Sequence, residues 1–269
     1  MTSEFKLAVS GAAGRMGQRI IAFSNESKIV SLAAAFDIAT HPRIGDDVGL
    51  LAGIGEKGVL LSDSMVAAKG CNVLIDFSSA EATESHIKFC AENGINLVVG
   101  TTGLSDKVKA DIKKASEKVA VVFAPNMGVG INVLLSIVNK MAAVLGDEYD
   151  VEIIEAHHNK KKDAPSGTAI GLAEAVASGM QVSLAEKAIH GRSGLVGARP
   201  KKEIGIHAVR GGDIIGEHTV MFAGPGETIE VSHSVLTRDV FAKGAVRAAE
   251  FLAGKKSGLF NMQDVLGLK

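Results

Sequence analysis

The segment Glu155–Thr168 reads EAHHNKKKDAPSGT and gathers two histidines, three lysines and two acids within fourteen residues. Such residues occur in metal sites, in nucleic-acid surfaces, in solvated loops and in anion-binding active sites. An imidazole can transfer a proton near neutral pH, and an ammonium group can hold a carboxylate. The four kinds of site make different demands on their surroundings, and these demands separate them.

A metal site and a nucleic-acid surface are both disfavoured. His157 and His158 are neighbours at the end of an expected strand, so their side chains should point to opposite faces, and no cysteine lies nearby. A nucleic-acid surface needs a basic excess and aromatic residues, but the chain has Lys+Arg 29 against Asp+Glu 30, one Tyr and no Trp. We therefore expect neither a bound metal nor a nucleic-acid partner.

An anion site agrees better with the end of the segment, although for Lys160 and Lys162 a solvated loop remains the simplest interpretation. SGTAIGLAEAVASGM predicts a helix with Ser166 as its N-cap. The N–H groups of Gly167 and Thr168 then lie in the first helical turn, where anions bind. With a lysine to hold a carboxylate and an imidazole to donate a proton, this arrangement suits hydride transfer to a carboxylate-bearing C=N group or conjugated imine.

A second chemical motif, GAAGRMG, lies directly after the apolar run KLAVS and directly before the helical pattern QRIIAF. Glycines at Gly11, Gly14 and Gly17 allow a sharp turn and a close approach to a pyrophosphate. The spacing is not the strict GxGxxG, so its context has to support it. Asp37 ends the next expected strand, 20 residues after Gly17, where a ribose-binding carboxylate is expected. We therefore predict a dinucleotide site.

Two later turns, Gly100–Gly103 (GTTG) and Pro125–Met127 (PNM), also follow expected strands. Ligands of open α/β sheets bind outside the carboxyl ends of the strands, so these turns are placed to border a nicotinamide. Taken alone, they are ordinary loops.

The elements that must position these motifs alternate in the first half of the chain. Short apolar runs predict strands, and stretches from Glu81 and Ser105 predict helices between them. The predicted strands are Lys6–Ser10, Ile29–Phe36, Asn72–Phe77, Ile95–Val99 and Val119–Ala124. Continuous apolar strands separated by helices indicate a parallel sheet covered on both faces, as in a doubly wound, Rossmann-like α/β domain.

The pattern changes after Asn126. GINVLLSIVNKMAAVLG predicts a long apolar helix, DVEIIEAHH a strand, and EIGIHAVR, DIIGEHTVMFAG and ETIEVSHSV three more strands, the last two joined at Gly224-Pro225-Gly226. This predicts an open antiparallel or mixed sheet with helices on one face. VFAKGAVRAAEFLAG is helical again and is expected to return to the first domain.

The composition bounds the class of protein. The chain has 269 residues, 46% hydrophobic and 22% charged, as in a soluble globular protein of one large or two ordinary domains. Cys71 and Cys90 are expected to be reduced thiols. MTSEFKLAVSG lacks the pattern of a signal peptide, and Pro125, Asn126 and Asn132 interrupt the most apolar region, which predicts a strand, a turn and a helix instead of a membrane span. We expect a cytoplasmic protein without a membrane partner.

The motifs EAHHNKKKDAPSGTA, GAAGRMG, GTTG, APNM and EHTVMFAGPGETIEVSH resemble the 4-hydroxy-tetrahydrodipicolinate reductase (dihydrodipicolinate reductase) family, from Lys6 to the terminal SGLFNMQDVL. The resemblance implies NADH- or NADPH-dependent reduction of a small cyclic dicarboxylate, 4-hydroxy-tetrahydrodipicolinate, in lysine and diaminopimelate biosynthesis. It also implies a dinucleotide-binding domain of residues 1–128 and 239–269. An inserted α+β domain, residues 129–238, would bind substrate and build a homotetramer.

The resemblance also assigns roles to residues. His157 is the acid/base, Lys161 a proton donor, and His158, Gly167 and Thr168 are substrate contacts. The cofactor contacts it implies are Gly11, Ala12, Ala13, Gly14, Arg15, Met16, Asp37, Gly100, Thr101, Thr102, Ala124, Pro125, Asn126 and Met127. Because a solvated lysine titrates at about 10.4, its chemistry favours carboxylate binding and orientation of the acid for Lys161. Arg238, in a family-like RxxFAxGA pattern, is a weaker candidate.

The cofactor preference and two other functions stay open. Many family members follow the ribose acid with an arginine that grips a 2′-phosphate, but Ile38 follows Asp37 here, which leaves Arg15 and Arg43 as candidates. A related amino-acid dehydrogenase, such as one acting on aspartate, would share the glycine loop without needing HHxxK…SGT. A non-catalytic dinucleotide-sensing protein would tolerate loss of the histidine and the lysine, and both are present.

Overall fold

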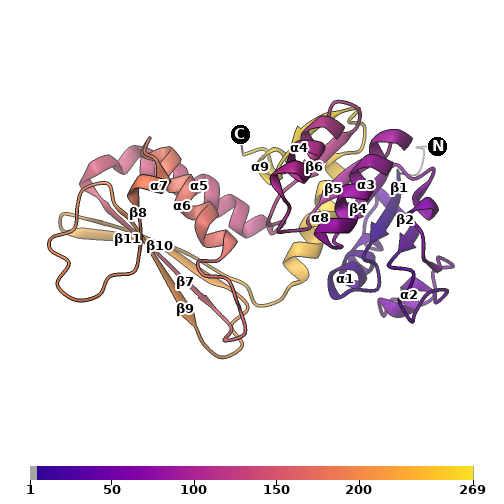
Figure 1. The fold of residues 1–269 in the computed structure, drawn as a ribbon, viewed down its shortest axis with the longest axis horizontal. Helices are drawn as coiled ribbons and strands as arrows, with labels where there is room; N and C mark the ends of the chain where they lie inside the picture. The colour runs from indigo at the N-terminus through magenta and orange to yellow at the C-terminus, as the bar shows by residue number, and fades with distance from the viewer. Residues whose placement is uncertain (1–4, 269) are drawn as a thin grey trace. The chain divides into compact units, whose positions relative to one another are not determined.

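The computed structural model describes residues 5–268 and divides the chain into two compact units (Figure 1). Unit 1 comprises Met1–Val129 and Asp239–Lys269, and unit 2 comprises Gly130–Arg238. The first four residues of the segment in which no signal peptide was expected lie outside the described range. Each unit has its own sheet and its own apolar core.

Unit 1 is built on a parallel sheet in the order β12-β6-β5-β4-β1-β2-β3. Its strands are β1 (Phe5–Ser10), β2 (Val30–Phe36), β3 (Leu61–Ser62), β4 (Val73–Asp76), β5 (Asn96–Val99), β6 (Ala120–Phe123) and β12 (Gly258–Phe260). The five strands predicted from the sequence are confirmed. The strands β3 and β12 were missed, as were α2 (Val48–Leu51), η1 (Met65–Ala68) and α9 (Met262–Leu266), because such short elements show no periodicity.

Helices cover both faces of this sheet, which explains why its strands are apolar without alternation. Leu7 and Val9 of β1 enter one core with α1 (Arg15–Ser24) and α8 (Asp239–Phe251). Ala8 enters the other core with α3 (Ala80–Asn93) and α4 (Asp106–Ala115). The chain returns to this unit through α8.

Unit 2 has a mixed sheet in the order β11-β10-β7-β9-β8, with α5 (Val129–Leu145) and α6 (Gly167–Gly179) packed into the core of one face (Figure 1). The strands are β7 (Asp150–His157), β8 (Ala188–His190), β9 (Ile204–Arg210), β10 (Glu217–Gly224) and β11 (Glu227–Ser234). The predicted mixed sheet with one helical face is confirmed. The short elements η2 (Gly146–Glu148), α7 (Leu184–Lys187) and β8 were missed.

The predicted start of the strand DIIGEHTVMFAG was wrong, because β10 begins only at Glu217. The residues before it form irregular backbone pairs beside the end of β7. His158 N donates to Ile214 O at 2.7 Å, and Gly211 N donates to His157 O at 2.9 Å. Ile214 and Ile215 therefore belong to this irregular segment and not to a strand.

The predicted strand, turn and helix over the most apolar region are confirmed by β6 and α5. The stretch Val129–Glu148, α5 with η2, is long and apolar enough to cross a membrane by length and composition. One side of α5 nevertheless packs into the core of unit 2 through Ile131, Leu134 and Val138. Its apolar character is explained, on that side, by core packing.

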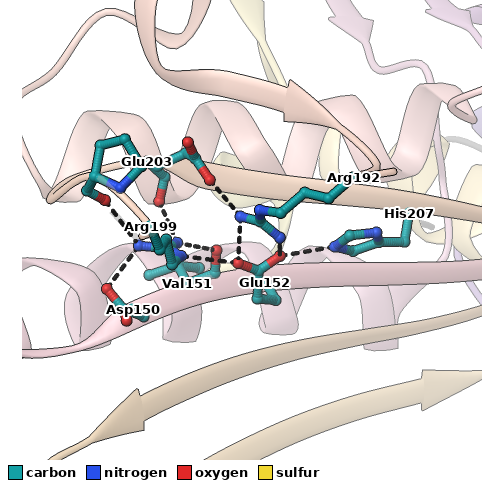
Figure 2. Close-up of polar contacts among 8 residues, drawn as sticks. Asp150, Val151, Glu152, Arg192, Arg199, Glu203 and His207 are labelled. Atoms are coloured by element: carbon teal, nitrogen blue, oxygen red, sulfur yellow. Dashed lines mark hydrogen bonds and ion pairs between the residues drawn. The ribbon is translucent and has the colours of Figure 1, made fainter. Parts of the chain in front are cut away.

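Ion pairs fix the segment between β8 and β9 onto β7 (Figure 2). Glu152 accepts hydrogen bonds from Arg192 at 2.8 Å, from Arg199 at 2.9 Å and from His207 at 2.7 Å. Arg192 also pairs with Glu203. Burial alone would raise the pKa of Glu152, but the hydrogen bonds from Arg192, His207 and Arg199 lower it to about 2. Glu152 is therefore ionised at neutral pH and holds this segment in place.

Two glycines inside helices should respond oppositely to alanine. A Cβ on Gly244 in α8 would lie 1.7 Å from Met127 O, whereas the nearest atom to a Cβ on Gly171 in α6 is Leu135 Cδ2 at 3.8 Å. We expect Gly244→Ala to lower the free energy of unfolding by roughly 1–3 kcal/mol through overpacking. Gly171→Ala should raise it by about 0.5–1 kcal/mol through helix propensity. Chemical denaturation measures both, and equal effects would contradict the packing shown here.

Candidate functional site

The glycine loop of unit 1 begins where β1 ends, and the space around it admits only glycine at two positions. Gly11 has a φ of +65°, and a Cβ there would lie 2.4 Å from Phe77 O. A Cβ on Gly17 would lie 2.2 Å from Gly11 O. Gly14, the N-cap of α1, has no side chain to cap the first N–H groups of the helix. These groups are suited to an anion such as a pyrophosphate.

The structure brings Asp37 to this loop, as the sequence predicted. Asp37 follows β2, and its Oδ2 accepts a hydrogen bond from Ala13 N at 3.0 Å while its Oδ1 accepts one from Ile38 N at 2.9 Å. Beside them lies a pocket of about 240 Å³. It is lined by Ser10, Gly11, Phe36, Asp37, Ile38, Asp63, Ser64, Met65, Ser78, Ala82 and His86.

The pocket beside Asp37 is acidic. Both Asp37 and Asp63 line it, and no lysine or arginine from the described residues does. Arg15 is exposed on α1, and Arg43 is exposed and paired with Asp46. Neither arginine proposed to offset the charge of Asp37 is therefore a lining residue of this pocket.

The other candidate cofactor residues lie at the carboxyl ends of two neighbouring strands. Gly100, Thr101 and Thr102 follow β5, and Ala124 to Met127 follow β6. A Cβ on Gly100 would lie 2.1 Å from the Phe77 ring, so glycine is required there by packing. Parallel strands place all these turns on the same edge of the sheet as the glycine loop.

In unit 2, the segment Glu155–Thr168 is organised around Glu155, which is fully buried in β7. Its Oε2 accepts hydrogen bonds from His157 Nδ1 at 2.6 Å and from an Arg210 nitrogen at 2.8 Å. Its Oε1 accepts from the second Arg210 nitrogen at 2.8 Å and from Ser166 N at 3.0 Å. Burial alone would raise the pKa of Glu155, but the hydrogen bonds from Arg210 and His157 outweigh it and lower the pKa below its ordinary value.

His157 is thereby held in one orientation. The ionised Glu155 carboxylate can only accept a hydrogen bond, so the Nδ1 of His157 carries a proton and Nε2 is the nitrogen that can exchange one. His157 is buried at the end of β7, with 9% of its surface exposed. An imidazole positioned in this way can serve as an acid or a base.

A second imidazole lies edge-on to the first. The rings of His157 and His218 are 5.2 Å apart at an interplanar angle of 77°. Ser166 Oγ caps α6 by accepting from Ala169 N, and it lies 3.1 Å from His218 Nε2. Burial, reinforced by the charge of His157, lowers the pKa of His218 to about 4. His218 is therefore neutral at physiological pH, and its Nε2 shares a hydrogen bond with the Ser166 hydroxyl.

The remaining candidates lie in the loop after β7, at the start of α6 and at the end of unit 2. Lys161 Nζ pairs with Asp163 at 2.9 Å, and its side chain is 20% exposed. His158 has a buried Nδ1 without a protein hydrogen-bond partner. Gly167, exposed, and Thr168, half-buried, open α6, as the N-cap prediction required. Among the described residues, no group of His, Cys, Asp or Glu is arranged to hold a metal ion. Arg238 is the last residue of unit 2 and is exposed.

Sequence reasoning missed three residues of this cluster. Glu155 was detectable, because it precedes His157 by two positions in a strand and so shares its face. Arg210 and His218 come from β9 and β10, and only the strand register brings them to β7, where Arg210 lies opposite His157 and His218 opposite Glu155. No local pattern indicates that pairing.

A parallel sheet with a glycine loop and a ribose-type carboxylate, together with a separate α+β unit that carries a buried proton-transfer group, defines a nicotinamide-dependent oxidoreductase. Residues 5–127 match the family described as dihydrodipicolinate reductase, N-terminus, and residues 130–266 match dihydrodipicolinate reductase, C-terminus. The chain belongs to the dihydrodipicolinate reductase family.

Individual relatives agree with this assignment over nearly the whole chain. The chain is 49% identical to the 4-hydroxy-tetrahydrodipicolinate reductase of Geotalea daltonii and 48% identical to that of Geobacter sulfurreducens, covering 98% of this chain and 99% of each relative. A dipicolinate-bound dihydrodipicolinate reductase from Paenisporosarcina sp. TG-14 is similar in structure, with a TM-score of 0.75 and 27% identity, over 97% of this chain and 98% of that one. These matches favour the reductase over the amino-acid dehydrogenase and the dinucleotide-sensing protein left open by the sequence.

The neutral state of His218 should make stability depend on pH. The folded protein holds the pKa of His218 at about 4, against an ordinary value of 6.5. As the pH falls below 6.5, only the unfolded state binds this proton, so the free energy of unfolding falls, by about 2 kcal/mol at pH 5. His218→Asn cannot titrate and should lack this part of the decline. Chemical denaturation of both proteins at pH 5 and pH 8 measures the difference, and parallel declines would exclude His218 as the cause.

Proposed function

We propose that this protein reduces 4-hydroxy-tetrahydrodipicolinate to tetrahydrodipicolinate with NADH or NADPH, a step of lysine and diaminopimelate biosynthesis. Replacement of the substrate hydroxyl by hydrogen consumes one hydride and one proton and releases one water. The family assignment and the names of the relatives support the substrate. The observation that carries the chemistry is the buried His157, held through Nδ1 by Glu155 beside a lysine and the start of α6.

The proposal divides the work between the two units. When bound, the nicotinamide supplies the hydride. In unit 1, the glycine loop binds the pyrophosphate through backbone N–H groups and Asp37 binds the adenosine ribose. In unit 2, the first turn of α6 and Lys161 bind substrate carboxylates, and His157 supplies the proton.

Lys161 fits carboxylate binding better than proton donation. Its ammonium is already paired with Asp163 and remains partly accessible. An ammonium group is a compact positive charge with three hydrogen-bond donors, which suits it to hold a carboxylate. His158, three residues before Lys161, and Thr168, seven residues after it, are proposed as further substrate contacts.

We also propose that the protein works as a homotetramer in the cytoplasm. Ile154, Val209 and Met221 alternate with residues that face the helical core, so they lie on the opposite face of the unit 2 sheet, which neither α5 nor α6 covers. Such a face is suited to pairing with another copy. The cytoplasmic location is supported by Cys71 and Cys90, which are buried free thiols.

Two substitutions separate proton transfer from substrate binding. His157→Ala should lower kcat by about 10²–10⁴ and leave dicarboxylate inhibitor affinity near that of the parent, because it removes a positioned acid. Lys161→Ala should weaken inhibitor binding by roughly 1.5–3 kcal/mol, the cost of a charge-assisted contact. NADH oxidation with freshly prepared substrate and inhibitor titration measure these effects. Unchanged turnover in His157→Ala would remove that residue from the mechanism.

The acidic pocket beside Asp37 predicts the cofactor preference. Two carboxylates repel a 2′-phosphate, so the parent should bind NADH at least as tightly as NADPH. Asp37→Ala should weaken NADH binding and raise the affinity for NADPH relative to that for NADH. Dissociation constants of both cofactors, measured by fluorescence titration, test this. A parent that strongly prefers NADPH, with a preference unchanged in Asp37→Ala, would show that Asp37 does not contact the ribose.

A further inference from the structure

We propose that Glu155 and Gly216 dedicate the Nε2 atom of His157 to proton transfer: the carboxylate holds the ring by Nδ1, and the glycine keeps the space beside Nε2 open for substrate. Glu155 is then a positioning residue and Gly216 an access residue. The inference rests on the proposed reduction, because it names the atom that supplies its proton.

The Glu155 carboxylate is held by hydrogen bonds on both of its oxygens, a set of contacts called the clamp below. Each oxygen of Glu155 has two donors: His157 and Arg210 on Oε2, and Ser166 N and Arg210 on Oε1. The donors come from β7, β9 and the start of α6, so the carboxylate cannot rotate without losing several hydrogen bonds. Arg210 also donates to Asp163 O at 2.8 Å and so ties in the loop that carries Lys161.

The clamp determines which nitrogen of His157 is available. A buried ionised carboxylate accepts and cannot donate, so His157 keeps its Nδ1 proton in both protonation states. The bond is short, at 2.6 Å, as expected for a charge-assisted hydrogen bond. Only Nε2 gains or loses a proton.

Gly216 lies beside the Nε2 atom of His157. A Cβ on Gly216 would lie 3.1 Å from His157 Nε2, 3.5 Å from His157 Cδ2 and 3.7 Å from His218 Cε1. The φ of Gly216 lies outside the left-handed region, so backbone conformation does not require glycine there. Gly216 is also buried, where an alanine would otherwise be an ordinary core residue. A methyl group at this position would block the approach to Nε2, and glycine leaves it open.

His218 fits the same assignment. Its ring meets His157 edge-on, and its Nε2 is engaged by the Ser166 hydroxyl. A neutral, engaged imidazole neither competes for the proton of His157 nor adds a second positive charge beside it. His218 is therefore compatible with His157 as the proton donor of this cluster.

The proton step balances in these atoms. Protonated His157 gives its Nε2 proton to the substrate atom that holds the electron pair after hydride addition. The N–H bond at Nε2 breaks, its electrons stay on the ring, and solvent later returns a proton. Glu155 keeps its charge throughout, and the Nδ1–H bond persists.

Two glycine variants, one of them a matched control, test whether Gly216 keeps the approach to His157 Nε2 open. Gly216→Ala should lower kcat at least tenfold with an unchanged NADH dissociation constant. Gly211→Ala should behave like the parent, because a Cβ on Gly211 meets no atom within 4 Å, although the residue also lies beside β7, where its N–H bonds to His157 O. Thermal unfolding of both variants shows whether each is folded. A folded Gly216→Ala that turns over as fast as Gly211→Ala would overturn the access role.

Imidazole ¹⁵N NMR of the parent tests whether Glu155 holds the proton of His157 on Nδ1, and it needs no turnover. The His157 signals of the neutral ring should show a protonated Nδ1 and an unprotonated Nε2, and Glu155→Gln should give a mixture of tautomers. An Nε2-protonated neutral ring in the parent would overturn the clamp even in an active enzyme. An inactive parent would instead overturn the proposed reduction, while the NMR result would still decide the tautomer.

Discussion

A buried negative charge at Glu155 is the constraint on which the rest of unit 2 depends. An ionised carboxylate without partners costs several kcal/mol in an apolar interior, so its presence requires donors on every side. They come from three separate elements: the neighbouring imidazole on β7, a guanidinium at the end of β9 and a backbone N–H at the start of α6. Satisfying one charge therefore fixes the meeting point of two strands and a helix, which is where the candidate acid lies.

β7 carries an arginine-bound glutamate on each of its two faces. Glu152 and Glu155 are three residues apart, so their side chains point to opposite sides of the strand. Glu155 faces the helical core and, with Arg210, orients His157. Glu152 faces away from that core and, with Arg192 and Arg199, holds the segment between β8 and β9 (Figure 2). One of these arginine-bound glutamates thus holds the proposed proton donor, and the other fixes a surface segment on the face proposed for self-association.

The glycine loop of unit 1 is held mainly by close backbone contacts. Its turn after β1 is defined by backbone contact, since side chains at Gly11 or Gly17 would collide with Phe77 O or Gly11 O. Asp37 completes the loop by accepting from Ala13 N, so the residue expected to bind the ribose also stabilises the turn expected to bind the pyrophosphate. Asp37 and Asp63 line the same pocket, and this is the basis of the proposed preference against a 2′-phosphate.

Local patterns in the sequence were sufficient to predict much of the fold and part of the candidate site. Apolar strands alternating with helices indicated the parallel sheet, Ser166 marked the start of α6, and GAAGRMG with Asp37 indicated the dinucleotide edge, because each signal arises from neighbouring residues. Short elements such as β3, β8 and β12 gave no such signal. The partners of His157 were beyond local reach: Arg210 and His218 lie 53 and 61 residues away in the chain, and the register of β9 and β10 on β7 alone brings them together. Sequence by itself determined which residue types were available for chemistry. Tertiary structure decided which nitrogen of His157 is held by a carboxylate and which is left without that partner, because Glu155 is fixed by donors from segments far apart in the chain.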